Sequence, residues 1–468
     1  MIFANGDCVE GGQMRYASRE QEFEYVDGLF AKTLKKDLSR FTVIYGRRGT
    51  GKTTLVWRAA KNHPELPFIY LCPFRTSARD LARRWGKDAA QALGYPYEPA
   101  FEKPGDVLRF LFAESEKKPL AVFVDECQDI TDISPSFWGE MQYGWDFAKD
   151  KSRILLLMGG SVEPAIRKIF EDYDEPFYQR HNGLLQLRPF RPTVLESLLR
   201  EANPGAKPED LLLLYAITGG VPSYVEKLLD AGAADFSSMV EAFFRDGSFF
   251  MTEALLMLAN ELRVDSPYYA LLMRLMAEGV TKREELQKRL PEVQAGGYLD
   301  RLQWLYGLVK RVDPVVYMGY RKARYDLVDP YLAFWHAFAA ARLDLVSSHQ
   351  WEEVKRYFRE RWPDYAVRAQ IRWFRAKIWE SCWYPKLGPW WDRSGKIEID
   401  LVAADEKRRI AWIFEMERPG CPSEEWAVRQ KAARMLEACR TLHGFDVRTK
   451  CLTMEDVMRP VEEFAPPD

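Results

Sequence analysis

Short apolar runs alternate with segments of helical periodicity in the first part of the chain. Apolar runs of four to six residues are typical of buried strands, and apolar residues three and four positions apart are typical of helices. Helical spacing occurs from Ser18, a residue type that suits a helix N-cap, and again over 78–93. The apolar runs are 41–45, 67–72, 120–124, 153–158 and 184–187. Strands that alternate with helices predict an α/β fold with a parallel sheet.

The pattern changes after the last of these runs, where only helical segments follow. Residues 191–250 resemble the small helical lid that follows an NTPase core. Over 251–348, three short helical segments with start and stop signals precede two strand-like runs around a turn, which predicts a winged helix. Ten of the 15 Trp residues lie from Trp335 onward, and this shift in composition predicts a separate C-terminal domain over 349–468.

Composition and charge argue against several classes of protein. The chain has 468 residues and a net charge of −2, so contact with nucleic acid would need a local basic patch. No apolar run reaches the length of a transmembrane helix, and the first residues lack the pattern of a secretory signal. The seven Cys are scattered without a Cys-x-x-Cys pair, which argues against a zinc ribbon and for a reducing compartment. We therefore expect a cytoplasmic protein.

Residues 46–53 match the phosphate-loop pattern G-x-x-x-x-G-K-[ST] between a predicted strand and a predicted helix. The glycines let backbone N–H groups turn inward around phosphates, and the new helix directs its positive end at the anion. Lys52 is expected to reach the β- and γ-phosphates of ATP, and Thr53 to ligate Mg²⁺. The expected nucleotide-binding residues here are Gly46, Arg47, Arg48, Gly49, Thr50, Gly51, Lys52, Thr53 and Thr54.

An acidic pair follows the apolar run 120–124. Two carboxylates at the end of a buried strand can divide the chemistry of phosphoryl transfer between them. Asp125 is expected to hold Mg²⁺, and Glu126 to polarise the attacking water as the catalytic base. A solvated acidic turn is the alternative for such a pair in isolation.

The run 153–158 ends in polar residues that form a third candidate. In NTPases whose catalytic glutamate follows the aspartate, an extra strand lies between the phosphate loop and the acidic strand, and its tip commonly carries a sensor of the γ-phosphate. Ser161 is the candidate sensor. Met158 stands where such a side chain is expected, so the alternative is that Ser161 caps the next helix.

Several motifs in a fixed order carry a resemblance to a known family. The chain resembles the prokaryotic, mostly archaeal-type P-loop ATPases of the AAA-like and signal-transduction (STAND) class, over nearly its whole length. The motifs are Ser18-Arg19-Glu20, Gly46-Arg47-Arg48, Asp125-Glu126-Cys127-Gln128, Tyr178-Gln179-Arg180, Leu187-Arg188-Pro189-Phe190, Gly219-Gly220-Val221-Pro222-Ser223-Tyr224 and Tyr325-Asp326-Leu327-Val328-Asp329-Pro330-Tyr331-Leu332-Ala333-Phe334-Trp335.

The resemblance implies roles for residues outside the two central motifs. It implies that Arg180 senses or stabilises the γ-phosphate, with a surface salt bridge as the alternative. Arg19 is implied near the adenine edge. Gly219, Gly220 and Pro222 are implied as the turn through which the lid meets the nucleotide, with an ordinary helix end as the alternative.

The predicted winged helix carries only a small excess of cations. Residues 266–345 contain 12 Lys and Arg against 9 Asp and Glu, and the third helix offers a single cation. A helix that reads base edges needs several donors. Arg321, Lys322 and Arg324 cluster instead in the wing, where they could contact DNA phosphates without reading sequence. Packing within the chain or against a protein partner is the alternative.

The C-terminal segment resembles the core of restriction-endonuclease-like domains. In active members an Asp and a Glu on neighbouring strands bind Mg²⁺, and a Lys two residues after the Glu positions water. Asp400 and Glu415 match the carboxylates as a possible second metal site, with Glu380 as a third group, but Glu417 occupies the Lys position. Strand alternation directs Arg418 to the opposite face. Nuclease activity is therefore not expected.

Together these patterns predict an ATP-binding and ATP-hydrolysing molecular switch whose nucleotide state controls its other domains. A nucleotide-tethered scaffold or regulator without significant turnover is one alternative, and an ATP-regulated nuclease effector is another. ATP and Mg²⁺ are the expected cofactors, with DNA, a protein or a second copy as possible partners. The predicted domains are a tail (1–17), a P-loop ATPase core (18–190), a helical lid (191–250), a winged helix (251–348) and a nuclease-like domain (349–468).

Overall fold

The computed structural model describes residues 19–35, 38–261, 266–316, 323–420 and 425–467. The chain divides into two compact units, of which one ends at Pro189 and the other begins at Phe190. The predicted end of the core, residue 190, lies one residue after the end of the first unit, and the assignment of 18–190 as an ATPase core stays a prediction. No helix in the described ranges is both long enough and apolar enough to cross a bilayer.

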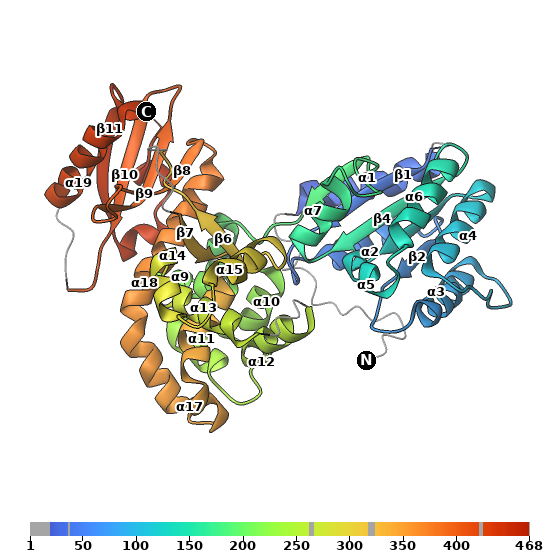
Figure 1. Ribbon diagram of the computed structural model, residues 1–468, viewed down its shortest axis with the longest axis horizontal. Coiled ribbons are helices and arrows are strands. Elements are labelled where there is room, and N and C mark those ends of the chain that lie inside the picture. Colours follow the sequence, from blue (N-terminus) through green and yellow to red (C-terminus); the bar gives the residue numbers. More distant parts are fainter. Residues whose placement is uncertain (1–18, 36–37, 262–265, 317–322, 421–424, 468) are drawn as a thin grey trace. The chain divides into compact units, whose positions relative to one another are not determined.

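The first unit is built on a five-stranded parallel sheet (Figure 1). Its strands are β1 (Arg40–Tyr45), β2 (Phe68–Leu71), β3 (Leu120–Val124), β4 (Ile154–Gly160) and β5 (Gly183–Gln186). They lie in the order β2-β3-β4-β1-β5. The predicted α/β class and parallel sheet are therefore correct. The order also places β4 between the strand before the phosphate loop and the strand before the acidic pair.

Alternate residues of the central strands pack into two separate cores, one on each face of the sheet. On β4, Leu156 and Met158 join one core while Leu155 and Leu157 join the other. Each strand is thus buried on both faces, which explains its unbroken apolar sequence. The first core is covered by α3 (Ala78–Leu93), α4 (Pro104–Lys117), α6 (Phe137–Ala148) and α7 (Glu163–Glu171). The second is covered by α1 (Glu20–Lys35) and α2 (Lys52–Asn62).

Helices dominate the first part of the second unit, and its elements follow the predicted order. Three helices precede a two-stranded antiparallel sheet over 267–327, as a winged helix would require, although that assignment stays a prediction. The helices are α8 (Pro192–Ala202), α9 (Pro208–Thr218), α10 (Pro222–Asp230), α11 (Phe236–Phe243), α12 (Phe249–Leu256), α13 (Pro267–Ala277), α14 (Arg283–Arg289), α15 (Ala295–Trp304), α16 (Pro330–Phe338) and α17 (Leu343–Ser347). The strands are β6 (Val309–Val312) and β7 (Arg324–Leu327).

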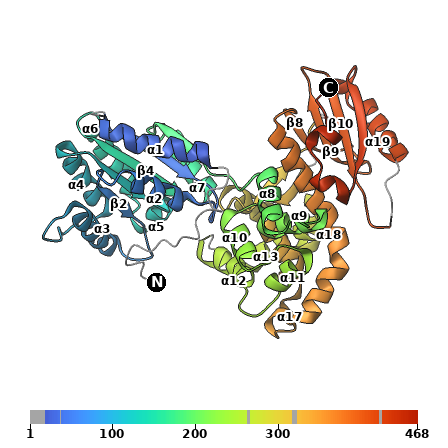
Figure 2. The same cartoon turned by 180° about the vertical axis from the view of Figure 1, so that it is seen from behind.

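The second unit ends in a four-stranded sheet with the order β11-β10-β9-β8. Its strands are β8 (Lys386–Trp391), β9 (Glu398–Asp405), β10 (Ile410–Met416) and β11 (Asp446–Leu452). Only the β10–β11 pair is parallel. The helix α19 (Glu425–Ala438) lies beside this sheet and buries Val428, Ala432 and Met435 in a shared core (Figure 2).

A single long helix, α18 (Trp351–Ser381), contacts both the helices and the sheet of this unit. The Trp373 ring packs on Tyr215 of α9, with ring centroids 5.2 Å apart, while its indole N–H donates to Val457 O at 3.0 Å. Phe374, next along the helix, packs on Phe464. Trp373, one of the tryptophans that suggested a separate C-terminal domain, therefore joins α18 to other parts of one compact unit.

Candidate functional site

The phosphate loop connects β1 to α2 and depends on glycine at its sharpest turns. Gly46 has φ +152°, and a Cβ atom there would lie 2.1 Å from Leu187 O. Gly51 has φ +93° in the left-handed region and directly precedes α2. Larger residues are strained in such conformations. The loop thus ends on the N-terminus of α2, where helix N–H groups are available to an anion.

Lys52 is buried with 5% exposure, and its ammonium lies against the loop itself. Its Nζ donates to Gly46 O at 2.8 Å and to Arg47 O at 3.4 Å. The Thr50 hydroxyl donates to the same Arg47 carbonyl at 2.7 Å. The first carbonyls of the loop therefore hold the ammonium at the place where the sequence expects phosphates.

Thr53 and Asp125 meet at the carboxyl end of the sheet, as a shared metal site requires. The Thr53 hydroxyl donates to Asp125 Oδ2 at 2.6 Å, and the Tyr70 hydroxyl donates to the same oxygen at 3.1 Å. Burial and the neighbouring Glu126 charge raise the pKa of Asp125 above its ordinary value, while Thr53 and Lys52 oppose the shift. A hydroxyl and a carboxylate are the hard oxygen ligands that Mg²⁺ takes, so this pair fits that ion.

Glu126 is held by its neighbours rather than extended into solvent. Its backbone is left-handed, with φ +48° and ψ +43°, which is uncommon for a residue other than glycine. Its Oε2 accepts hydrogen bonds from the Ser161 N–H, the Ser161 hydroxyl and Gln128 Nε2. Burial would raise the pKa of Glu126, but the Lys52 ammonium and these hydrogen bonds together lower it. The carboxylate is therefore charged at neutral pH.

Ser161 does not cap the helix that follows β4. The N-cap position of α7 belongs to Val162, which makes no side-chain cap, so the capping alternative is wrong. The Ser161 hydroxyl instead lies 2.6 Å from Glu126 Oε2. Its predicted role as a γ-phosphate sensor stays a prediction, but its partner in this structure is the predicted catalytic base.

The two arginines assigned by resemblance are both engaged inside the first unit. Arg180 pairs with Asp146 at 3.0 Å and donates to Pro176 O at 2.6 Å. The salt-bridge alternative thus describes Arg180 in this arrangement. Arg19 is 7% exposed, pairs with Glu22 at 3.0 Å and donates to Arg188 O. Their contacts with a nucleotide stay predictions.

The glycines of the predicted lid turn lie in the second unit, between α9 and α10. Gly219 ends α9 with φ +57°, and Gly220 continues the turn with φ +75°. Pro222 opens α10, where a missing N–H is harmless. The geometry is that of a helix end followed by a helix start, which was the alternative. The predicted contact of this turn with the nucleotide stays a prediction.

Among the cations of the predicted wing, Arg324 forms an ion pair within the second unit. Its Nη1 donates to Glu398 Oε2 at 2.9 Å, and its guanidinium carbon lies 4.2 Å from the centroid of the Trp391 ring. Lys282 also pairs with Glu398, at 3.2 Å. The expectation that Arg324 is available to DNA phosphates is therefore wrong for this arrangement. Arg321 and Lys322 lie outside the described residues.

The carboxylates of the predicted second metal site are paired with cations. Arg418 Nη2 donates to both oxygens of Asp400, at 2.8 and 3.0 Å, and Arg418 Nη1 donates to Glu415 Oε2 at 3.3 Å. Lys431 of α19 donates to the same Glu415 oxygen at 2.7 Å. Burial and the Asp400 carboxylate raise the pKa of Glu415, and the two cations oppose this shift.

The expected orientation of Arg418 is therefore wrong. Strand alternation was the basis for placing it on the opposite face, but β10 ends at Met416 and the period of two ends with it. Glu380 accepts hydrogen bonds from the Thr193 N–H and hydroxyl. Among the described residues, no group of three or more His, Cys, Asp or Glu side chains could hold a metal. Because a guanidinium already bridges Asp400 and Glu415, these residues do not fit a resident ion.

We expect the Asp400–Glu415 pair to bind no divalent ion in the wild-type protein. The Arg418 guanidinium pairs with both carboxylates, so an ion would have to displace an existing charge pair. Mn²⁺ binding followed by electron paramagnetic resonance, without nucleotide, should give the same number of bound ions in wild type and Asp400→Ala. Supercoiled plasmid should remain uncut by either. The expectation would be contradicted if the wild type cut plasmid and Asp400→Ala lost both this activity and one bound ion.

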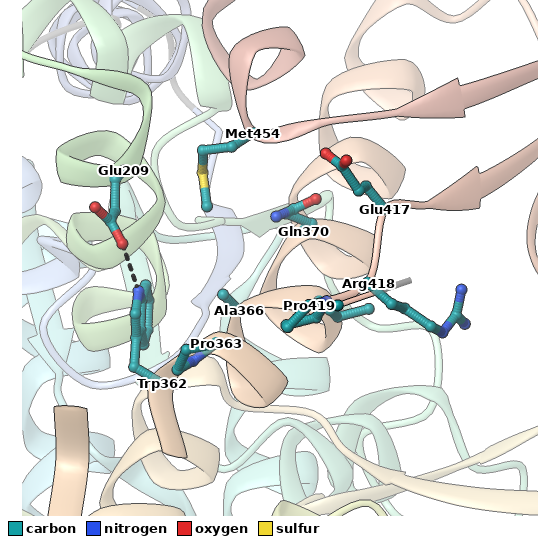
Figure 3. Close-up of a pocket in the computed structure, with 11 residues that line it drawn as sticks. Glu209, Trp362, Pro363, Ala366, Gln370, Glu417, Arg418, Pro419 and Met454 are labelled. Atoms are coloured by element: carbon teal, nitrogen blue, oxygen red, sulfur yellow. Dashed lines mark hydrogen bonds between the residues drawn. The ribbon is translucent and has the colours of Figure 1, made fainter. Parts of the chain in front are cut away.

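The loop after β10 also lines a pocket of about 320 Å³ in the second unit (Figure 3). In Figure 3 the Trp362 indole N–H donates to Glu209, at 2.9 Å, and the Arg418 guanidinium points away from the other labelled residues. The lining residues are Glu209, Trp362, Pro363, Ala366, Val367, Gln370, Glu417, Arg418, Pro419, Gly420 and Met454. The loop that carries Arg418 to Asp400 is therefore also a wall of this pocket.

Comparison with known proteins gives a family match in the first half of the chain and a relative that covers most of it. Residues 16–228 match the model of a family described as an ATPase domain predominantly from Archaea. An uncharacterized protein of Methanocaldococcus jannaschii is 22% identical over 410 residues, which cover 86% of this chain and 87% of that protein.

Solved structures similar to this chain include the following two. A Walker-type ATPase of Pyrococcus abyssi is 19% identical, covers 68% of this chain and 95% of its own, and has a TM-score of 0.48. The ORC2 protein of Aeropyrum pernix, in ADPNP–ADP complexes, is 21% identical, covers 71% and 93%, and has a TM-score of 0.46. The family match spans the phosphate loop, the acidic pair and Ser161, and it supports a P-loop ATPase domain in residues 16–228.

Proposed function

We propose that the first unit binds and hydrolyses ATP with Mg²⁺, and that its nucleotide state controls the arrangement of the lid, winged helix and C-terminal segment. One observation carries the proposal: Thr53, Asp125 and Glu126 converge beside the phosphate loop that holds Lys52. The match to an archaeal-type ATPase family supports the same chemistry.

Each residue has a distinct task in the proposed reaction. The loop N–H groups and Lys52 would bind the β- and γ-phosphates of ATP. Thr53 and Asp125 would hold Mg²⁺, which neutralises phosphate charge when bound. Glu126 would accept a proton from the attacking water, a task that requires the deprotonated carboxylate that its surroundings maintain.

The proposal predicts phosphate release that depends on Mg²⁺. Purified protein supplied with ATP and Mg²⁺ should release inorganic phosphate, and EDTA should remove the activity because the Thr53–Asp125 pair then lacks its ion. Hydrogen exchange of the second unit should differ between the ATP-bound and ADP-bound protein if nucleotide state controls it. ATP binding without phosphate release would instead favour the scaffold alternative, in which the nucleotide only tethers the chain.

A further inference from the structure

Three hydrogen bonds converge on one oxygen of the Glu126 carboxylate. The Ser161 hydroxyl donates to Oε2 at 2.6 Å, the Ser161 N–H at 3.1 Å and Gln128 Nε2 at 2.8 Å. Ser161 directly follows β4, and Gln128 lies in the short helix η2 (Cys127–Asp129) after the acidic pair. Two segments that are separate in the sequence therefore donate hydrogen bonds to the same carboxylate oxygen.

The backbone of Glu126 is held by a hydrogen bond as well. The Glu126 N–H donates to Asp125 Oδ1 at 3.0 Å. Two glycines at the end of β4 allow the acidic pair to approach this closely. A Cβ atom on Gly159 would lie 2.8 Å from Asp125 Oδ1, and one on Gly160 would lie 2.7 Å from Gln128 Oε1. The hydrogen bonds to Glu126 thus depend on the close contact between the end of β4 and the residues that follow β3.

The second carboxylate oxygen has no such partner among the described residues, since the hydrogen bonds to the Glu126 side chain all reach Oε2. A carboxylate held by one oxygen presents the other in a single orientation. Without these hydrogen bonds, the Glu126 carboxylate could turn toward the Lys52 ammonium, whose charge already lowers the pKa of Glu126. Such an ion pair would engage both the base and the phosphate-binding lysine.

We propose that Ser161 and Gln128 are positioning residues, which hold Glu126 by Oε2 so that Oε1 faces the attacking water. This inference rests on the proposed ATPase function and adds to it. It differs from a γ-phosphate sensor, because a sensor contacts the nucleotide and a positioning residue acts through Glu126. The two roles predict different kinetics, since loss of a contact with the nucleotide weakens ATP binding and loss of orientation slows only the chemical step.

The test is steady-state ATP hydrolysis by Ser161→Ala, with Ser161→Thr as the conservative variant. We expect kcat to fall about tenfold or more in Ser161→Ala, while the ATP dissociation constant stays within about twofold of wild type. Ser161→Thr keeps a hydroxyl and should recover most of kcat. Ser134→Ala, which removes a buried hydroxyl at the end of α5 (Ile130–Ile133), is the matched control and should leave kcat unchanged.

A double-mutant cycle with Glu126→Gln makes the test specific. If Ser161 acts through Glu126, Ser161→Ala should have little further effect once that carboxylate is gone. An equal fall in kcat in both backgrounds, or weaker ATP binding with unchanged kcat, would overturn the positioning role. A wild-type protein without Mg²⁺-dependent turnover would contradict the proposed function itself, whereas normal turnover in Ser161→Ala would contradict only this inference.

Discussion

Replacement of Lys52 by alanine should abolish detectable ATP hydrolysis and weaken ATP binding more than a hundredfold. The ammonium is buried at the phosphate loop, where it donates to two backbone carbonyls of that loop. A hydrogen bond to a charged group contributes up to about 3 kcal/mol, and the phosphates of ATP would make more than one such bond with Lys52. At about 1.4 kcal/mol per tenfold, this loss corresponds to more than two decades in Kd.

Isothermal titration with ATP and Mg²⁺ measures this effect directly. Lys61→Ala is the matched control, because Lys61 lies in the last turn of the same helix on its exposed side. Circular dichroism before and after heating checks that the variant keeps the fold. Unchanged ATP affinity in a folded Lys52→Ala protein would disprove the phosphate-binding role of the loop.

Glu126→Gln should keep ATP affinity within a few-fold of wild type while phosphate release falls about a hundredfold or more. The amide has the shape of the carboxylate and can still accept hydrogen bonds from Ser161, but it cannot take a proton from water. Removal of a general base typically costs two to four decades in rate. The local structure should therefore survive while the chemical step fails.

Single-turnover phosphate release and ATP titration separate these two quantities. Glu116→Gln, an exposed position of α4, is the control for loss of a negative charge elsewhere in the first unit. Equal single-turnover rates in wild type and Glu126→Gln would show that the acidic pair is only a structural turn. Weakened ATP binding with an unchanged rate would place Glu126 in nucleotide binding instead.

The parallel sheet was predictable because its central strands are buried on both faces. Every position of β3 is apolar and buried, and such a run can be recognised without knowledge of its neighbours. The phosphate loop was equally predictable, because its glycines and Lys52 lie close together in the sequence. Local patterns that coincide with local structure are thus readable from the chain alone.

The partners of Glu126 were not predictable in the same way. Ser161 lies 35 positions away in the sequence, and its contact depends on the left-handed backbone at Glu126, which residues other than glycine rarely adopt. Gln128 belonged to the motif that suggested the family but had no assigned role. Tyr70 lies within an apolar run, and the pairing of β2 with β3 brings its hydroxyl to Asp125.

Two cations were misplaced for reasons of register and distance. Arg418 was assigned to a face by strand alternation, which fails after the last residue of β10. Arg324 was assigned to the surface of a wing, but its carboxylate partner lies 74 positions later, on β9. Charged residues pair with whatever opposite charges the fold places beside them. The composition of one segment therefore does not determine whether its cations are available to bind a partner.

The long helix α18 has a consequence for how the chain could be divided or recombined. Its 31 residues span about 46 Å and bury Trp362 and Trp373 along the way. A cut at residue 349 would remove the contacts that Trp362 and Trp373 make with residues before it, and would expose both side chains to water. The junction at Pro189 separates compact units and would cost far less. Exchange of modules between related chains should therefore favour that junction and treat everything after it as indivisible.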